Sequence, residues 1–316
     1  MIISILLVAL GFALLIGGAD LLVRGASSLA LRLKVPDIVI GLTVVAFGTS
    51  TPELVVNLVS AHQGAADIAF GNIIGSNIFN ILGILGICAM VRPLQVKRGT
   101  TWREIPFALL TSFILLVLVN DSHFTPGARN LLTWGDGLVL LGFFAIFLVY
   151  THNLSKQGVE SESNSRLYPL LTSLAFVVGG LAGLIGGGNL VVDHSINLAR
   201  MFGVSESVIG LTIVAIGTSL PELSTSLIAT LKNKPDIAVG NVIGSNIFNL
   251  LFIMGVTSLF SPLNYAKVFN PGQFVMIGST FLLFIMMFNP KRHRIDRWEG
   301  AILVTVYVLY SVLFLR

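Results

Sequence analysis

Residues 39–60 read VIGLTVVAFGTSTPELVVNLVS, and residues 208–229 read VIGLTIVAIGTSLPELSTSLIA. Fourteen of these 22 positions are identical. A second pair follows, since DIAFGNIIGSNIFNIL at 67–82 returns as DIAVGNVIGSNIFNLL at 236–251 with 13 of 16 positions identical. Both pairs are offset by 169 residues, so the halves align without a gap between the motifs. The chain is therefore a duplicated unit.

The duplication divides the chain into two halves. We expect a first repeat over residues 1–151, with its motifs at 39–82, and a second repeat over 167–316, with its motifs at 208–251. Between them, the polar segment HNLSKQGVESESNSR at 152–166 is too short for a domain. We interpret it as a flexible linker.

The composition excludes a water-soluble globular domain. Hydrophobic residues make up 54% of the 316 positions and charged residues only 11%, whereas soluble domains carry about 25% charged residues. A membrane-spanning helix needs about 20 mostly apolar residues. Ten such stretches occur, near residues 2–23, 36–61, 68–91, 104–120, 131–151, 168–190, 206–231, 237–259, 271–289 and 299–315. These predict an all-α polytopic protein with ten transmembrane helices, located in the cell membrane.

Each repeat has an odd number of spans, which predicts that the two halves have opposite orientations in the membrane. Five spans separate equivalent points of the halves, so the second copy must cross the membrane in the opposite sense to the first. With the N-terminus outside, 15 of the 19 Lys and Arg residues fall in inside connections and 4 fall outside. Because positive residues favour the cytoplasmic side, both termini are predicted outside. A 5+5 inverted repeat with interrupted helices is typical of secondary transporters, and we expect two broken helices per half.

Each first motif places a glutamate among oxygen-bearing residues inside an apolar span. Spacings of i, i+3, i+4 and i+7 put four residues on one helical face: Ala46, Thr49, Ser50 and Glu53. Pro52 has no N–H, which frees a carbonyl one turn earlier and predicts a broken helix. The second copy repeats the pattern with Pro221 and the set Ala215, Thr218, Ser219 and Glu222. Intramembrane carboxylates mark ion pathways, so this duplicated pair predicts an ion-binding site.

The second motifs add amide and hydroxyl oxygens at four-residue spacing. The first copy supplies Asn72, Ser76 and Asn80, and the second supplies Asn241, Ser245 and Asn249. No histidine or thiolate lies in these faces, and oxygen ligands select hard cations such as Ca²⁺, Na⁺ or Mg²⁺. The single cysteine, Cys88, excludes an internal disulfide and a cysteine-based zinc site.

The two motifs resemble a known family. GTSTPE at 48–53 and GTSLPE at 217–222, each followed by GNxIGSNIFN, are similar to the alpha-repeats of the sodium/calcium exchanger branch of the calcium/cation antiporter superfamily. The resemblance covers essentially the whole chain, and the short central loop is similar to that of prokaryotic members. Some relatives carry an aspartate at the position of Asn249, so a third carboxylate is not expected in this site.

The resemblance implies ligands for two kinds of ion. Glu53 and Glu222 would bind Ca²⁺ together with backbone oxygens of Thr49 and Thr218. Sites for Na⁺ would draw on both glutamates and on Ala46, Ser50, Ser76, Ala215, Ser219 and Ser245, and Asn80 and Asn249 would line the middle.

The implied function is Na⁺/Ca²⁺ antiport by alternating access. Two ionised glutamates balance one Ca²⁺, and three Na⁺ ions, the stoichiometry that the family implies, would leave a charge of +1. The glycine-rich first and sixth spans would slide or rock past the rest. Ca²⁺ and Na⁺ are then the transported substrates in a lipid bilayer, with no bound cofactor and no nucleic-acid partner; a monomeric state is compatible with the sequence.

Three other functions make different demands on the sequence. A channel would need a continuous polar pathway, whereas the polar groups here gather in one duplicated site. An intramembrane protease would need paired aspartates, a Ser/His pair or an HExxH motif in the spans, and none is present, so we do not expect an enzyme. A proton-coupled Ca²⁺ antiporter is the alternative that remains, although that branch carries Asn and Ala in place of the Thr-Ser pair.

The predicted orientation can be tested by labelling. A cysteine introduced as Ser161→Cys, in a Cys88→Ala background, should react with a membrane-impermeant maleimide only when the cytoplasmic side is accessible. Labelling of the same cysteine from outside intact cells would reverse the predicted topology.

Overall fold

The structure is a bundle of long helices. The computed structural model describes residues 1–124, 129–156, 166–202, 215–288 and 293–314. Among these residues, seven helices are long and apolar enough to cross a membrane. An eighth is counted if the bent pair Asp37–Thr49 and Thr51–His62 forms one span. The chain is therefore an all-helical membrane protein with multiple apolar helices.

Several of these helices are built from consecutive segments, some of them π-helical turns. The seven are α1 (Ile2–Leu33); α5, η2 and α6 (Ala66–Ile78, Phe79–Leu85, Gly86–Val91); η3 and α7 (Thr100–Glu104, Ile105–Leu118); α9 (Trp134–Ser155); α10 (Leu170–Met201); α14, η5 and α15 (Pro235–Ile247, Phe248–Ile253, Met254–Phe260); and η6 and α16 (Lys267–Phe269, Asn270–Met286). The bent pair is α2, η1 and α3 (Asp37–Ile40, Gly41–Val45, Ala46–Thr49) with α4 (Thr51–His62). The remaining described helices are α8 (Asp121–Phe124), α12 (Ala215–Gly217), α13 (Leu220–Leu231) and α17 (Arg297–Phe314).

The helix boundaries follow the sequence repeat. α4 and α13 are both 12 residues long and begin 169 positions apart. The first expected span, 2–23, is longer in the structure because α1 continues to Leu33. The beginning of the expected span 206–231 and most of the predicted linker 152–166 lie outside the described residues.

The first-motif helices are broken where the prolines predict. α3 ends before Ser50, whose φ of −83° and ψ of 9° leave the helical region, and α4 then continues at an angle of 45°. Ser219 has nearly the same backbone angles, −91° and 8°, directly before α13. Pro52 and Pro221 each occupy the second position of the new helix, where a missing N–H costs no hydrogen bond.

The second-motif helices are continuous, so the expectation of two broken helices per half is wrong for this pair. Ala66–Val91 and Pro235–Phe260 each run without interruption. Neither contains a proline after its first residue, and each instead includes one π-helical segment, at Phe79–Leu85 and Phe248–Ile253. A π-helical turn shifts the backbone hydrogen-bond register without ending the helix.

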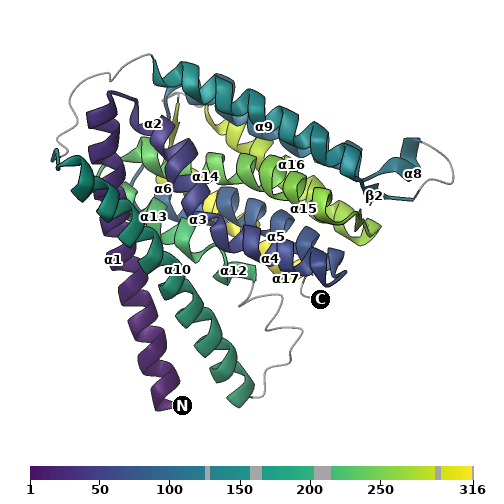
Figure 1. Ribbon diagram of the computed structural model, residues 1–316, viewed down its shortest axis with the longest axis horizontal. Helices are drawn as coiled ribbons and strands as arrows, with labels where there is room; N and C mark the ends of the chain where they lie inside the picture. The colour runs from purple at the N-terminus through teal and green to yellow at the C-terminus, as the bar shows by residue number, and fades with distance from the viewer. Residues whose placement is uncertain (125–128, 157–165, 203–214, 289–292, 315–316) are drawn as a thin grey trace.

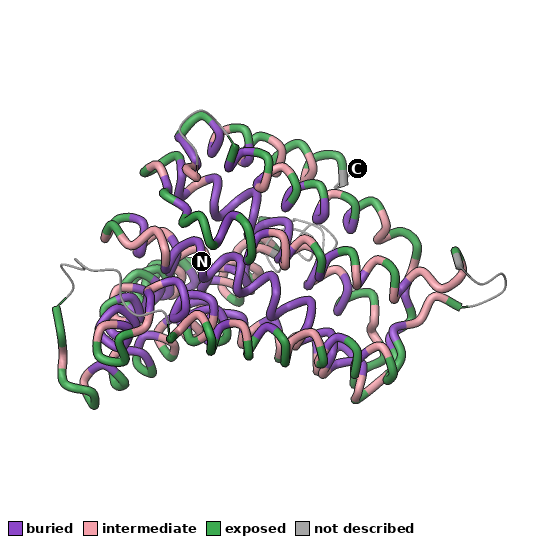
Figure 2. The backbone as a smooth tube through the Cα atoms, turned by 90° about the horizontal axis from the view of Figure 1, so that it is seen from above, coloured by how far each residue is buried: buried purple, intermediate pink, exposed green. Residues whose placement is uncertain are grey.

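These two continuous helices form the core of the bundle. Most of their apolar side chains are buried, and many of these, including Phe70, Ile78 and Leu251, belong to one large hydrophobic cluster. Figure 2 shows buried positions concentrated in the interior of the bundle and exposed positions on its outside. The outer helices expose large apolar side chains such as Leu171 and Val178, which a lipid environment would cover.

Two short strand pairs, which the sequence did not predict, link the halves. β1 (Leu94–Gln95) pairs antiparallel with β4 (Arg294–Ile295), and β2 (Leu131–Leu132) pairs antiparallel with β3 (Leu263–Asn264). Each pair joins a strand of the first half to a strand of the second. β1 and β3 are offset by 169 residues, and β2 and β4 directly precede α9 and α17. Exchanging the halves therefore maps one pair onto the other.

α1 and α10 pack side by side through glycines (Figure 1). A Cβ atom on Gly18 would lie 2.7 Å from the carbonyl oxygen of Gly180, and one on Gly11 would lie 2.8 Å from that of Gly187. Residue numbers rise along one helix as they fall along the other, so the helices are antiparallel. Small residues at such crossings let helix backbones approach closely. The glycine-rich faces that we expected to support sliding thus face each other.

A separate apolar cluster attaches this helix pair to α13 and α14. Ala26 of α1 and Leu184 of α10 belong to it, together with Ala229 of α13. Close to it, the Asp20 carboxylate forms an ion pair with Lys232, directly after α13. α1 is therefore attached to the second-half motif by apolar and ionic contacts, and α10 by apolar contacts.

The tight crossing predicts a large difference between neighbouring glycines. Gly18→Leu should lower thermal stability by several degrees, because overpacking of a close contact costs about 1–3 kcal/mol. Gly17→Leu is the matched control, since a Cβ there meets nothing within 4 Å. The thermal stability of both variants is measured as the fraction of protein that stays monodisperse after heating in detergent. Equal stability of the two variants would contradict the packing described here.

Candidate ion-binding site

The two broken helices bring their glutamates into one buried site. Glu53 and Glu222 lie in the first turns of α4 and α13, and each is only 1% exposed. The Ser50 hydroxyl donates to Oε1 of Glu222 at 2.8 Å, and the Ser219 hydroxyl donates to Oε1 of Glu53 at 3.1 Å. Each glutamate is therefore held by the serine of the opposite half.

The second oxygen of each carboxylate is left without a hydrogen-bond partner. Oε2 of Glu53 and Oε2 of Glu222 are both buried and unbonded within the described chain. The Ser245 hydroxyl donates to the already bonded Oε1 of Glu222 at 3.4 Å, and the buried hydroxyl of Ser76 has no partner. Buried charge without a partner is costly. The helix N-termini offset part of this cost, and a hard cation bound between the carboxylates would offset more.

The neighbouring threonines are fixed across the halves by asparagines. The Thr49 hydroxyl donates to Oδ1 of Asn241 at 3.0 Å, and the Thr218 hydroxyl donates to Oδ1 of Asn72 at 3.3 Å. A hydroxyl has a single hydrogen to donate. The Thr49 hydroxyl also lies 3.4 Å from the Ala46 carbonyl, so the shorter contact with Asn241 is the one that ties this side chain to the opposite half.

Asn241 is the better bonded of the two asparagines. Its Nδ2 donates to the Glu222 carbonyl at 3.3 Å and to the Ser226 hydroxyl at 2.9 Å. Asn72 has one further long contact, from Nδ2 to the Glu53 carbonyl at 3.5 Å. The sequence suggested both asparagines as sources of oxygen, whereas in the structure their amides support the residues around the carboxylates.

The asparagines at the π-helical segments form a second buried group. Nδ2 of Asn80 donates to Oδ1 of Asn246 at 2.9 Å, whereas neither side-chain atom of Asn249 has a partner. Asn246 and its repeat counterpart Asn77 are not among the residues that the sequence predicts for the site. Both copies of GSNIFN contain this asparagine, and that identity is the feature of the sequence that indicates them.

The two predicted alanines lie at the same helix breaks. Ala46 begins α3 and is fully buried, and its carbonyl accepts the backbone N–H of Ser50 at 3.0 Å. Ala215 begins α12, and its side chain lies outside the described part of the chain. Within the described residues, no group of three or more His, Cys, Asp or Glu side chains could hold a metal ion. The site therefore consists of two carboxylates and neutral oxygens.

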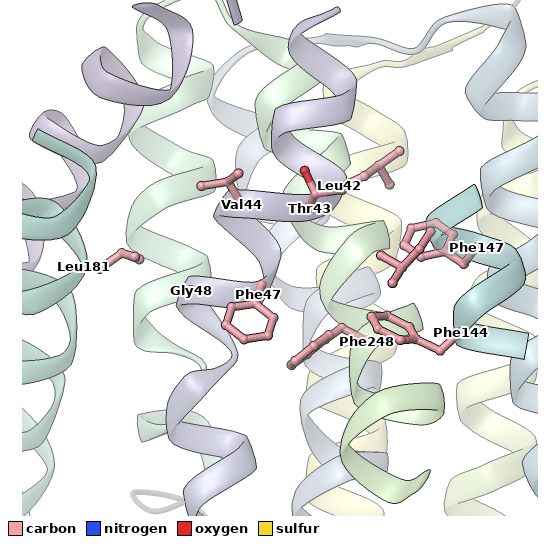
Figure 3. A pocket seen from close by; sticks show the side chains of 10 residues that line it. Leu42, Thr43, Val44, Phe47, Gly48, Phe144, Phe147, Leu181 and Phe248 are labelled. Atoms are coloured by element: carbon pink, nitrogen blue, oxygen red, sulfur yellow. The ribbon is translucent and has the colours of Figure 1, made fainter. Parts of the chain in front are cut away.

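An apolar pocket of about 370 Å³ lies beside the first helix break (Figure 3). Phe47, Phe144, Leu181 and Phe248 line it. Among the lining residues only Thr43 carries a side-chain oxygen, and that hydroxyl donates to the Val39 carbonyl at 2.6 Å. The pocket offers no ligand set for a cation, so it is distinct from the carboxylate site.

Comparison with known proteins assigns this architecture to a family. The family model described as sodium/calcium exchanger protein matches residues 3–152 and 172–316. The chain belongs to this family. Two similar relatives are the inner membrane protein YrbG of Escherichia coli, 38% identical over 98% of both chains, and the sodium/calcium exchanger MaX1 of Methanosarcina acetivorans, 31% identical over 98% of both chains.

A solved member of the sodium/calcium exchanger family has the same fold. The structure of the sodium-calcium exchanger NCX_Mj soaked with Na⁺ and Sr²⁺ is 33% identical to this chain, with a TM-score of 0.84. The match covers 99% of this chain and 98% of that one. The similarity therefore extends over the whole arrangement of helices that positions the two glutamates.

Proposed function

We propose that this protein exchanges Na⁺ for Ca²⁺ across the cell membrane by alternating access. The observation that carries the proposal is the crossed bonding of Ser50 to Glu222 and of Ser219 to Glu53. It joins two buried carboxylates from opposite halves in one oxygen-lined site. Family membership and the similarity to NCX_Mj support the same function.

The proposed ligands are those that the resemblance to sodium/calcium exchangers implies. Glu53 and Glu222 bind Ca²⁺ through their carboxylates, and Thr49 and Thr218 add backbone oxygens. The Na⁺ sites use both glutamates together with Ala46, Ser50, Ser76, Ala215, Ser219 and Ser245. Asn80 and Asn249 line the middle of the site. The serine hydroxyls that donate to a carboxylate keep lone pairs that can still face a cation, which supports this assignment.

The proposed topology is ten spans in two inverted halves, 1–151 and 167–316, with both termini outside. Besides the eight spans that the helices supply, α13 and α17 complete the count. The strand pairs support the alternation of the spans, because each pair joins two segments on the same predicted side of the membrane, β1 with β4 inside and β2 with β3 outside. The antiparallel packing of α1 on α10 is what a two-fold axis in the membrane plane would produce.

The charge of the site predicts the coupling. Two carboxylates carry −2, which one Ca²⁺ neutralises, whereas three Na⁺ ions leave +1, so each cycle moves net charge. Asn80 and Asn249 are neutral, so no third carboxylate is present to hold K⁺ beside Ca²⁺. α1 and α10 move as a pair past the remaining helices, because their close glycine contacts keep them together.

The decisive experiment measures ⁴⁵Ca²⁺ uptake into proteoliposomes loaded with Na⁺ and diluted into choline. We expect uptake only when Na⁺ is inside and choline is outside, and no change when K⁺ is replaced by an inert organic cation at clamped potential. Uptake without internal Na⁺ would indicate a channel. Uptake driven by a pH gradient in the absence of Na⁺ would replace the proposal with a proton-coupled antiporter.

A further inference from the structure

Four asparagines of the GSNIFN repeats lie in the protein interior, and two of them have no role in the site described above. Asn77, Asn80, Asn246 and Asn249 are all at most 3% exposed. Asn80 and Asn249 are proposed to line the ion site, whereas Asn77 and Asn246 are not. The hydrogen bonds of Asn246 indicate what it does.

The orientation of the Asn246 amide is set by a backbone group. Its Nδ2 atom lies 3.2 Å from the carbonyl oxygen of Asn77. A carbonyl oxygen can only accept a hydrogen bond, so the nitrogen of Asn246 must point toward it. The oxygen of Asn246 is thereby turned to the neighbouring side chain of Asn80.

This orientation is passed on to Asn80. Because Oδ1 of Asn246 can only accept, Asn80 must present Nδ2 to it, and the two atoms lie 2.9 Å apart. The Oδ1 atom of Asn80 is left buried without a hydrogen-bond partner. Ser76, one helical turn earlier on the same face, also has an unpartnered buried oxygen. Two adjacent oxygens are thus available to a cation.

The equivalent contact is missing in the other half of the repeat. By the 169-residue offset, Asn77 corresponds to Asn246 and Asn249 to Asn80. Neither side-chain atom of Asn77 or of Asn249 has a partner. The amide-to-amide contact therefore fixes one asparagine of the site and not its counterpart.

We infer that Asn246 is a positioning residue that reaches across from the second half and holds Asn80 with its oxygen toward the transported ion. The inference rests on the proposed function, since it assigns to Asn80 a ligand role in that site. Without Asn246, the Asn80 amide could turn and present an N–H group, which repels a cation.

The test uses Ca²⁺/⁴⁵Ca²⁺ exchange, which needs no Na⁺ gradient, with Na⁺ added as a competitor. Asn246→Leu should raise the apparent KM for Ca²⁺ or the half-inhibitory Na⁺ concentration by about fivefold or more, as expected when a buried hydrogen-bonded group loses its partner. Asn77→Leu is the matched control: it makes the same change at the repeat counterpart, whose side chain has no bond to lose, and should leave both values unchanged.

A double-mutant cycle separates orientation from general damage. In Asn80→Asp both side-chain atoms are oxygens, so orientation no longer matters. Asn246→Leu should then raise neither value, because Asn246 has no amide left to orient and its Oδ1 faces another acceptor. Equal effects of Asn246→Leu in both backgrounds, or wild-type values in the single variant, would overturn the inference. If Asn246→Leu does not fold, Asn246→Ala takes its place in the same cycle. Ca²⁺ exchange that is normal but not inhibited by Na⁺ in the wild type would instead contradict the proposed function.

Discussion

The structure depends on the burial of two carboxylates at facing helix breaks. Glu53 and Glu222 are held by serines from opposite halves, and each keeps one oxygen without a partner. Leaving such groups in a low-dielectric interior is unfavourable unless a cation is bound. A framework keeps these oxygens together. It consists of the helix breaks, the asparagines that bind the threonines, and the continuous core helices. The site therefore needs both halves, and neither half alone has a complete one.

The duplication explains why this framework is nearly symmetric, so the contacts that differ between the halves are informative. The strand pairs and the crossed serine contacts are exchanged when the halves are exchanged. The hydrogen bonds of the asparagines are less symmetric. Asn241 makes more of them than Asn72, and the Asn246 side chain has a contact that the Asn77 side chain lacks. Two nearly identical motifs thus support the site to different degrees. The proposed alternation between two arrangements would produce such a difference in any single one of them.

The sequence predicts the parts of the site that depend on local chemistry. Pro52 and Pro221 predict the helix breaks, and the structure confirms them. Helical spacing places Ser50 and Glu53 on one face, and in the structure each contacts a residue of the opposite half. The sequence does not predict the π-helical turns, because no residue type marks a shift of hydrogen-bond register. It also misses Asn246, since the role of that amide follows from a contact with Asn80 that lies 166 positions away. The two-residue strands depend equally on tertiary contact.

The central claim is that two glutamates from opposite halves form one shared site, and Ca²⁺ binding stoichiometry tests it most directly. Isothermal titration calorimetry in Na⁺-free detergent solution should give one Ca²⁺ per chain for the wild type. Glu53→Gln and Glu222→Gln should each abolish that binding, because either change removes a charge that Ca²⁺ requires in a water-poor site. Two Ca²⁺ per chain in the wild type, with one retained at normal affinity in each single variant, would show two independent sites and contradict the account.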